Sequence, residues 1–396
     1  MDEESAATGS GPFDPEVARE PRPFYARMRQ EGISRFHFGE HEAVFLTRYE
    51  DVHFALRHPE IFSSAMDAVS IGQKRPLIPL QIDPPEHAKY RRILDPQFSP
   101  GRVAAMDADA RKLVNEIVDR FVDDGECNFH TAFAVPLPCT LFLRIMGLPL
   151  EHLDRFLAWK DGIIRPDVPF GDLEAAERVR NETGEAIYAY FEEAIAQREH
   201  EPDDGLLTSI MHAEVEGRRM STEEVLDTCY LFLLGGLDTV TATLDCSIAY
   251  LARHPDQRRR LVEDPSSIAG AVEELLRYET PVTGVPRIVT QDVEMHGVQL
   301  RAGDHVTVVL GAADTDSTEF PDADSVDFDR QANRHFAFGG GPHRCLGSHL
   351  ARFELQVALE EWHRRIPDYR VKDGVELDYS PGIREVAHLP LVFEAS

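Results

Sequence analysis

The sequence predicts a mainly α-helical protein with a smaller β portion. Apolar residues recur at helical spacing in most windows between Asp51 and about Met211. The stretch GVPRIVTQDVEMHGVQLRAGDHVTVVL (284–310) instead alternates with a period of two between glycine turns, which is typical of a sheet. No internal repeat and no Gly/Ser linker divides the chain. We therefore expect a disordered leader over 1–12 and a single domain over 13–396.

The charge balance of the 396 residues is strongly acidic, with a formal net charge of −29. Nucleic acid and anionic membranes attract basic surfaces, so neither is expected as a partner. The N-terminus lacks a basic segment followed by an apolar one, so no secretory signal is predicted. The most continuous apolar run, CYLFLLGGL (229–237), is far too short to span a membrane. These features predict a cytoplasmic protein, which we expect to be a monomer.

The five cysteines form no C-x-x-C pair and no even disulfide framework, which favours a reducing compartment. Four of them lie in apolar or helical contexts and are interpreted as small buried hydrophobes; they are Cys127, Cys139, Cys229 and Cys246. The fifth, Cys345, lies in a glycine-rich loop and is considered separately.

The elements of the first half of the chain follow from periodicity and turn residues. FHFGEHEAVFLTRY (36–49) carries β-type residues around a glycine and predicts a hairpin. RKLVNEIVDRFV (111–122) and AIYAYFEEAIAQR (186–198) show helical spacing. Proline-rich turns at IDPPEH (82–87) and VPLPC (135–139) interrupt the helices.

The second half contains the best-signalled helix. Ser221 and Glu224 form a capping box, and the apolar pattern then runs to Ala252 before His254-Pro255 ends it. Three further segments are assigned by the same reasoning: a helix over 267–279, an irregular Asp-rich stretch over 311–337, and an amphipathic helix over 348–366.

The loop FGGGPHRCLG (338–347) places Cys345 just before the last of these helices. Free N–H groups at a helix start and the basic neighbours His343 and Arg344 favour a thiolate. Glycines 339–341 allow the backbone to approach a flat or bulky group. A phosphate loop would need a Gly-Lys-Ser/Thr ending, and the histidine spacing fits no common zinc site. The local chemistry leaves a structural turn and a thiolate site about equally supported.

Two helical segments carry charge or distortion in apolar surroundings. In GAVEELLRYE (270–279), Glu274 and Arg277 lie at i, i+3, so the pair is either solvated or partly buried. In LLGGLDTVTATL (233–244), two glycines precede an acid and a hydroxyl. Either the acid and the hydroxyl relay protons into an apolar site, or the glycines form a packing notch and the threonine bonds its own helix backbone.

Three cations stand apart from these motifs. His87 and Arg91 lie at i, i+4 after a Pro-Pro helix start and so share one face. Arg287 lies in the predicted sheet. Taken singly, each is interpreted as a solvated surface residue.

In this order and spacing, the motifs resemble those of the cytochrome P450 family of heme-thiolate monooxygenases. Phe338-x-x-Gly341-x-His343-x-Cys345-x-Gly347 matches the heme-ligand loop of the family at every defining position. Glu274-x-x-Arg277 matches its helix ion pair, and GGLDT (235–239) matches its oxygen-activation segment. The resemblance extends from the hairpin to the C-terminal PLVFE and is strongest to soluble bacterial members of the camphor-hydroxylase type. It implies an α-rich triangular prism with heme b between the long central helix and the helix after the cysteine loop.

The resemblance also implies roles for individual residues. Cys345 would bind the heme iron, and the backbone amides of Leu346 and Gly347 would tune its sulfur. Phe338 and Gly339 would lie beside the ring. The propionate partners would be His87, Arg91, Arg287 and His343, and the distal side would be lined by Gly235, Gly236, Asp238 and Thr239, of which the last two would deliver protons.

One position departs from the family pattern. The family commonly completes a triad around the helix ion pair with an arginine in a Pro-x-x-Arg-Phe segment. Here FPDADSVDF (320–328) has Ser325 and Val326 at those places. Arg330 or His335 is a possible substitute for the missing arm, or the arm is absent.

The expected activity is insertion of one oxygen atom from O2 into an apolar terpenoid, steroid, fatty acid or aromatic molecule. No flavin or iron–sulfur domain is evident, so an external ferredoxin and its NAD(P)H-dependent reductase would supply electrons. A basic patch is expected to dock the ferredoxin; its candidates are Lys89, Arg92, Arg344 and Arg352. Two alternatives share the fold: peroxide-driven oxygenation and a heme-thiolate isomerase or dehydratase. A third, from another class, is a heme sensor or carrier without turnover.

Substrate contacts are the least constrained expectation. The apolar candidates are Leu80, Leu237, Val240, Val285 and Ile383, drawn from segments expected to surround the heme. Arg75, Arg165 and Arg384 are either anchors for a substrate carboxylate or solvated surface residues.

Overall fold

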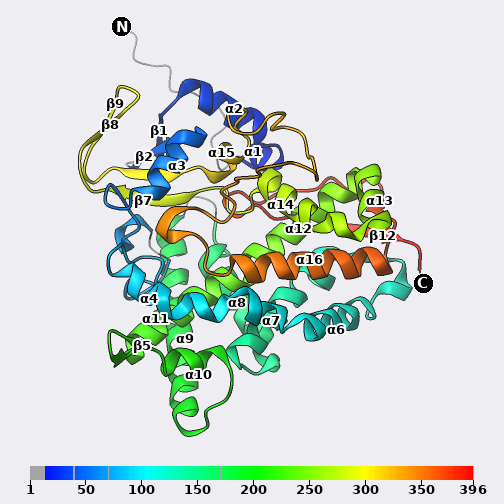
Figure 1. Ribbon diagram of the computed structural model, residues 1–396, viewed down its shortest axis with the longest axis horizontal. Coiled ribbons are helices and arrows are strands. Elements are labelled where there is room, and N and C mark those ends of the chain that lie inside the picture. The colour runs from blue at the N-terminus through cyan, green and yellow to red at the C-terminus, as the bar shows by residue number, and fades with distance from the viewer. Residues whose placement is uncertain (1–13, 39–40, 70, 170–171, 396) are drawn as a thin grey trace.

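A computed structural model describes residues 14–38, 41–69, 71–169 and 172–395 (Figure 1). The leader expected over 1–12 lies outside the described residues. The helices are α1 (Pro15–Arg19), α2 (Arg22–Glu31), α3 (Tyr49–Arg57), α4 (His87–Leu94), α5 (Pro100–Ala104), α6 (Asp107–Val118), α7 (Pro136–Met146), α8 (Leu153–Ile164), α9 (Leu173–His200), α10 (Leu206–Met211), α11 (Thr222–Leu237), α12 (Thr239–Arg253), α13 (Pro255–Glu263), α14 (Ile268–Glu279), α15 (Leu310–Asp314) and α16 (Ser348–Arg365).

The strands are β1 (Ser34–Phe38), β2 (His41–Leu46), β3 (Phe62–Ser63), β4 (Glu126–Asn128), β5 (Glu214–Val215), β6 (Arg218–Arg219), β7 (Val285–Val289), β8 (Val293–Met295), β9 (Val298–Leu300), β10 (His305–Val308), β11 (Tyr369–Val371) and β12 (Pro390–Phe393). Helices therefore dominate, and the expectation of a mainly α protein with a smaller β portion is confirmed.

The main sheet has the strand order β1-β2-β10-β7-β3. The expected hairpin is β1 with β2, paired antiparallel, and the period-two segment supplies β7 to β10. β10 joins the hairpin by running parallel to β2 and antiparallel to β7. Figure 1 shows this sheet and α1–α3 on one side of the molecule, with most of the other helices beyond it.

The central helix differs from its expected form. The capping box of Ser221 and Glu224 is present, with both reciprocal hydrogen bonds formed. The segment is not one continuous helix, however, because α11 ends at Leu237 and α12 starts at Thr239. Asp238 interrupts it with φ −114° and ψ −39°. The cause of this break lies in the contacts of Asp238, described below.

The hydrophobic core surrounds this central pair of helices. One cluster of buried side chains joins α12 to α6, α14 and α16 around Trp362, which is fully buried. A second cluster joins α11 to α7, α8 and α9 around residues such as Phe156 and Tyr230. The segment Thr222–Arg253 is long and apolar enough to cross a membrane, but 78% of its apolar window is buried inside the protein. It therefore serves here as a core helix.

Candidate heme-thiolate site

Cys345 lies in the loop between a short 3-10 turn, Gly341–His343, and α16. Its backbone N–H donates to the Phe338 carbonyl at 2.8 Å, which closes the loop. The sulfur retains accessible surface and accepts a hydrogen bond from the backbone N–H of Gly347. Ser348 begins the helix that follows, as expected.

The thiol of Cys345 is less acidic than the loop chemistry suggested. Burial raises its pKa above the ordinary value, and the opposing effects of the Gly347 N–H and of nearby Arg91 and Arg344 do not outweigh it. The Gly347 N–H and the nearby arginines nevertheless act in the expected direction, because each of them lowers the pKa. A bound metal ion would have to supply the remaining stabilisation of the thiolate.

The glycines of the loop differ in what surrounds them. Gly341 has φ +62°, and a Cβ there would lie 2.0 Å from the carbonyl oxygen of Leu56 in α3. This glycine lets the loop approach the backbone of α3. Gly339 also has positive φ, +65°, and only the His343 carbonyl lies near its Cβ position, at 3.9 Å.

Two histidines on the other side of the loop carry unpartnered ring nitrogens. The rings of His87, at the start of α4, and His343 lie 4.4 Å apart. Nε2 of each is buried and has no hydrogen-bond partner among the described residues, although that of His343 lies 3.6 Å from Asp83 Oδ1. Burial and the charges of His343 and Arg91 lower the pKa of His87 to about 4. Burial also lowers the pKa of His343, despite the nearby Asp83 carboxylate.

Two arginines complete this basic group. Arg287 on β7 is buried, and the one hydrogen bond of its side chain among the described residues runs from NH1 to the Pro286 carbonyl at 2.7 Å. Burial lowers its pKa to about 10. Arg91 donates to the carbonyls of Pro342 (3.3 Å) and Arg344 (2.7 Å) and thereby ties α4 to the cysteine loop. The four predicted propionate partners thus share one region, and the idea that each is a solvated surface residue is wrong.

This donor set fits heme. Buried imidazole nitrogens without a hydrogen-bond partner, and the buried charge of Arg287, are unfavourable unless a polar or anionic group binds them, and carboxylates are the matching partners. A thiol with accessible sulfur lies in the loop that Arg91 ties to the same helix. The residues therefore provide a metal ligand and carboxylate partners of the kind that an iron porphyrin requires.

The two glycines of the central helix have different surroundings. Gly236 is a packing notch, because a Cβ there would lie 2.8 Å from the Phe142 ring. Gly235 is exposed within an otherwise buried helix, and a Cβ there would meet no atom within 4 Å. The Thr239 hydroxyl donates to the Gly235 carbonyl at 3.1 Å, so the threonine does bond its own helix.

Asp238 is completely buried and bound by two cations from α8 and its C-terminal end. Lys160 Nζ donates to Oδ1 at 3.0 Å, and Arg165 donates to both carboxylate oxygens at 2.9 Å. Burial opposes ionisation, but these contacts outweigh it and lower the pKa of Asp238. They also explain the helix break, since the carboxylate turns away from the helix axis to reach α8.

The ion pair of α14 is fully buried. Arg277 donates to both oxygens of Glu274, at 2.9 and 2.8 Å. The third arm is Arg330, whose Nε lies 3.0 Å from both oxygens of Glu274. Ser325 contributes only its carbonyl, which accepts from both arginines. His335, the other substitute considered, instead lies 3.2 Å from Glu273.

Segments proposed to contact substrate meet near α15. Ile383 forms a bridge with Val282, and the Thr283 hydroxyl donates to the Gly382 carbonyl at 2.8 Å. An adjoining cavity of about 120 Å³ is lined by both segments and by apolar residues of α2. Among the predicted contacts, Leu80 is exposed, and Val285 and Ile383 are partly buried.

Several substrate and anchor predictions do not hold in this structure. Leu237 is 0% exposed within a core cluster, so it offers no surface to a ligand. Val240 is also buried. Neither Arg165 nor Arg384 is a solvated residue: Arg384 is buried and paired with Glu279. Arg75 pairs with Asp227 at 2.9 Å.

The predicted docking cations differ in their availability. Lys89 forms ion pairs with Glu86 and Glu216. Arg352 pairs with Glu273 and lies over the Phe338 ring, 4.3 Å from its centre. Arg92 and Arg344 are exposed, and neither forms an ion pair within the described ranges.

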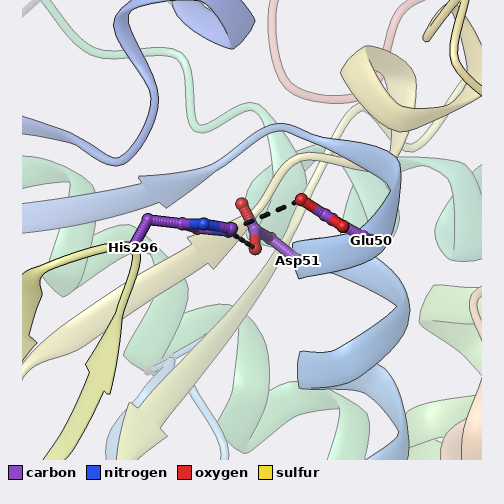
Figure 2. Close-up of side chains that lie close together, drawn as sticks. All are labelled: Glu50, Asp51 and His296. Atoms are coloured by element: carbon purple, nitrogen blue, oxygen red, sulfur yellow. Dashed lines mark hydrogen bonds and ion pairs between the residues drawn. The ribbon is translucent and has the colours of Figure 1, made fainter.

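A surface group of possible metal ligands lies away from this site (Figure 2). His296 Nε2, from the turn between β8 and β9, lies 2.7 Å from Asp51 Oδ1 and 3.6 Å from Glu50 at the start of α3. The Glu50 side chain is 72% exposed. The contacts explain the group as an ion pair that joins the β8–β9 hairpin to α3.

The chain is similar to known proteins in both sequence and fold. The sequence profile of the cytochrome P450 family matches residues 162–365. The chain is 34% identical to a steroid C26-monooxygenase of Mycolicibacterium smegmatis, over 88% of this chain and 87% of that protein. It is 34% identical to mycinamicin IV hydroxylase/epoxidase of Micromonospora griseorubida, over 93% and 94% of the two chains. Its fold matches that of CYP109E1 of Bacillus megaterium, solved in complex with testosterone, with a TM-score of 0.89 and 27% identity over 96% and 99% of the chains.

Proposed function

The chain belongs to the cytochrome P450 family of heme-thiolate oxidoreductases, and from this premise we propose that it is a cytoplasmic, heme b-dependent monooxygenase of apolar small molecules. We place the activity in a single domain over 13–396. The observation that carries the proposal is a group of His87, His343 and buried Arg287, with two buried imidazole nitrogens that lack hydrogen-bond partners among the described residues, beside the loop of the exposed residue Cys345.

In this proposal, Cys345 binds the iron, with the Gly347 N–H on its sulfur. His87 and His343 bind the propionates through their unpartnered Nε2 atoms, and Arg287 adds its buried charge. Arg91 acts mainly by holding the loop, because its NH1 donates to two loop carbonyls. Phe338, Gly339 and Leu346 are the further loop contacts proposed for the ring.

When bound, a heme-thiolate supplies dioxygen activation. The chain must then deliver protons to an apolar site. Thr239 holds its hydroxyl beside the opened turn at Gly235, where the helix is exposed. Asp238 is a poor proton donor while Lys160 and Arg165 hold it, since both lower its pKa. We therefore assign proton delivery to an Asp238 carboxyl that is released from these cations and turns toward Thr239.

The proposed substrate class is apolar and about the size of a steroid. The names of relatives specify a steroid, mycinamicin IV, vitamin D(3) and a methyl-branched lipid as substrates, and a structural relative was solved with testosterone. The partly buried Val285 and Ile383, together with Leu80, are retained as contacts, because the segments that carry Val285 and Ile383 meet beside an apolar cavity. Val240 is retained at the break of the central helix.

The proposed electron supply is a ferredoxin reduced by an NAD(P)H-dependent reductase. The candidate docking surface is limited to the exposed Arg92 and Arg344, because Lys89 and Arg352 form ion pairs with acidic neighbours. Ferredoxins are usually acidic, so exposed arginines on an otherwise acidic protein provide a local complement.

Cys345→Ser tests the proposal most directly. The wild-type protein with bound heme should show the carbon monoxide spectrum typical of thiolate ligation and a Soret shift with steroid-sized ligands. Cys345→Ser should lose the thiolate spectrum, because serine provides no thiolate ligand. The matched control is Cys127→Ser, which changes a cysteine on β4 and should keep both spectra. A thiolate spectrum in Cys345→Ser would contradict the assignment.

A further inference from the structure

Arg165 bridges two buried carboxylates. Its NH2 donates to Asp238 Oδ2 at 2.9 Å and lies 2.9 Å from Glu385 Oε2, an ion pair that lacks hydrogen-bond geometry. Glu385, in the C-terminal loop 380–389, has a side chain that is 4% exposed. One guanidinium group is therefore shared between the proposed proton donor and a second acid that no motif in the sequence singled out.

Glu385 also belongs to a second group of titratable side chains. His130, Asp245 and Glu385 each place one potential ligand atom within 4.8 Å of the others. His130 Nδ1 lies 2.7 Å from Asp245 Oδ2. Asp245 on α12 is 0% exposed, and its Oδ1 is buried with no hydrogen-bond partner in the part of the chain that the structure describes. The His130 side chain is 13% exposed and gives the group contact with solvent.

The charges of the combined network are balanced by a single proton. Asp238, Asp245 and Glu385 carry three negative charges when ionised, and Lys160 and Arg165 carry two positive charges. One proton on the His130 group therefore makes the buried network neutral. A divalent cation there would leave an uncompensated buried positive charge, which is costly.

Within the described residues, the other charged groups near His130, Asp245 and Glu385 are already paired or exposed to water. Arg384 neighbours Glu385 but is paired with Glu279. Asp161 contacts Lys160 at 2.8 Å, yet its side chain is 55% exposed and hence screened by water. Cys246, next to Asp245, is a buried thiol whose pKa is raised by burial. The proton must therefore be held by His130, Asp245 and Glu385 themselves.

The pKa shifts agree with this arrangement. Burial and the charges of Glu385 and Asp238 raise the pKa of Asp245 to about 7, although its hydrogen bond with His130 opposes the shift. Burial and the charge of Asp238 also raise the pKa of Glu385. Burial opposes a charge on His130, but its hydrogen bond with Asp245 outweighs this and raises its pKa. The whole group thus retains a proton more strongly than its members would in water.

We propose that His130, Asp245 and Glu385 share one exchangeable proton and that the charge of this group sets how firmly Arg165 holds Asp238. With the proton on the group, its negative charge is smaller, so Arg165 is attracted less toward Glu385 and holds Asp238 more firmly. Without it, ionised Glu385 competes for Arg165 and Asp238 is released more easily. Glu385 is thus a positioning residue, and this role rests on the proposed proton delivery by Asp238.

The first measurement needs no turnover. In the heme-bound protein with 15N-labelled histidine, NMR titration should show that Glu385→Gln and Asp245→Asn both lower the pKa of His130, since each removes a negative charge. Asp161→Asn, an exposed carboxylate beside the same cations, is the control and should leave it unchanged. An unchanged His130 titration in Glu385→Gln and Asp245→Asn would overturn the shared proton. Stoichiometric binding of added Zn²⁺ that displaces this proton would identify a cation site instead.

The second measurement links the group to Asp238. Glu385→Gln replaces the acid with a side chain that cannot ionise, so Arg165 should hold Asp238 more firmly. Product formed per NAD(P)H should then fall by about tenfold, the effect of strengthening the charged hydrogen bond between Arg165 and Asp238. Its dependence on pH near neutrality should also disappear. Glu385→Asp, which keeps the charge, should restore part of both.

The same loss should not appear in an Asp238→Asn background, because Arg165 then holds no carboxylate there. An equal loss in that background would overturn the proposal. If Asp238→Asn itself had no effect on product per NAD(P)H, proton delivery by Asp238 would be wrong, whereas the NMR result would stand on its own.

Discussion

At the scale of single residues, Glu354 is an acid without a counter-charge. It lies on α16, is 4% exposed, and no hydrogen bond or ion pair to it is found in the described part of the chain. Burial raises its pKa from 4.5 to about 8. At neutral pH the folded protein therefore holds this side chain mainly as a neutral acid.

The stability of the protein should consequently fall with rising pH through this residue. A raised pKa of an acid means that the folded state binds the proton more tightly, so the contribution is full below about pH 4.5 and is lost as pH approaches 8. Glu354→Gln should remove this dependence of stability on pH. Each unit by which the folded state raises the pKa corresponds to about 1.4 kcal/mol in the free energy of unfolding. The unfolding temperature of the variant relative to wild type should rise between pH 5 and about pH 9. Glu360→Gln, on the same helix but 33% exposed, is the control; a parallel rise there would show a nonspecific effect.

The residue scale also shows what the sequence could and could not predict. The positions of Cys345 and of the Glu274–Arg277 pair follow from motifs of fixed local spacing. The partners of these residues come from distant segments: Arg330 reaches Glu274 across 56 positions, and Arg165 reaches Asp238 across 73. Local periodicity carries no information on such contacts. For the same reason, Glu385 and His130 carried no signal in the sequence.

At the scale of elements, the centre of the molecule is a helix divided by one residue. Its start was predictable, because a capping box is a local pattern. Its break was not, because the cations that draw Asp238 out of the helix lie on α8. The glycines before the break were recognised as unfavourable in a helix, but only the packing of α7 distinguishes their roles.

The two glycines provide a matched test of that distinction. Gly236→Ala should destabilise the protein by about 1–3 kcal/mol, because its Cβ would lie 2.8 Å from the Phe142 ring and the ring must shift. Gly235→Ala should instead stabilise the fold by about 0.5–1 kcal/mol through helix propensity, since no atom lies within 4 Å. Thermal unfolding of the two variants should thus shift in opposite directions. Shifts of the same sign would contradict the packing assignment.

At the scale of the whole molecule, the acidic charge sets a condition for any acidic partner. A formal net charge of −29 repels an acidic protein unless the contact surface is locally basic. The loop and α4 near Cys345 provide such a surface in Arg92 and Arg344, both exposed. Arg352 and Lys89 are partly neutralised by Glu273 and by Glu86 and Glu216, so they contribute less field.

Charge reversal separates these two classes of cation. Arg92→Glu and Arg344→Glu should each weaken ferredoxin binding by about tenfold at low salt, and the loss should shrink as salt rises because surface charges are screened. Lys89→Glu is the matched control on α4 and should weaken binding less, since acidic neighbours already offset its charge. The measurement is ferredoxin affinity at low and high ionic strength with the heme spectrum checked for each variant. Because the protein as a whole repels an acidic partner, unchanged affinity in both arginine variants would mean that the ferredoxin approaches another face.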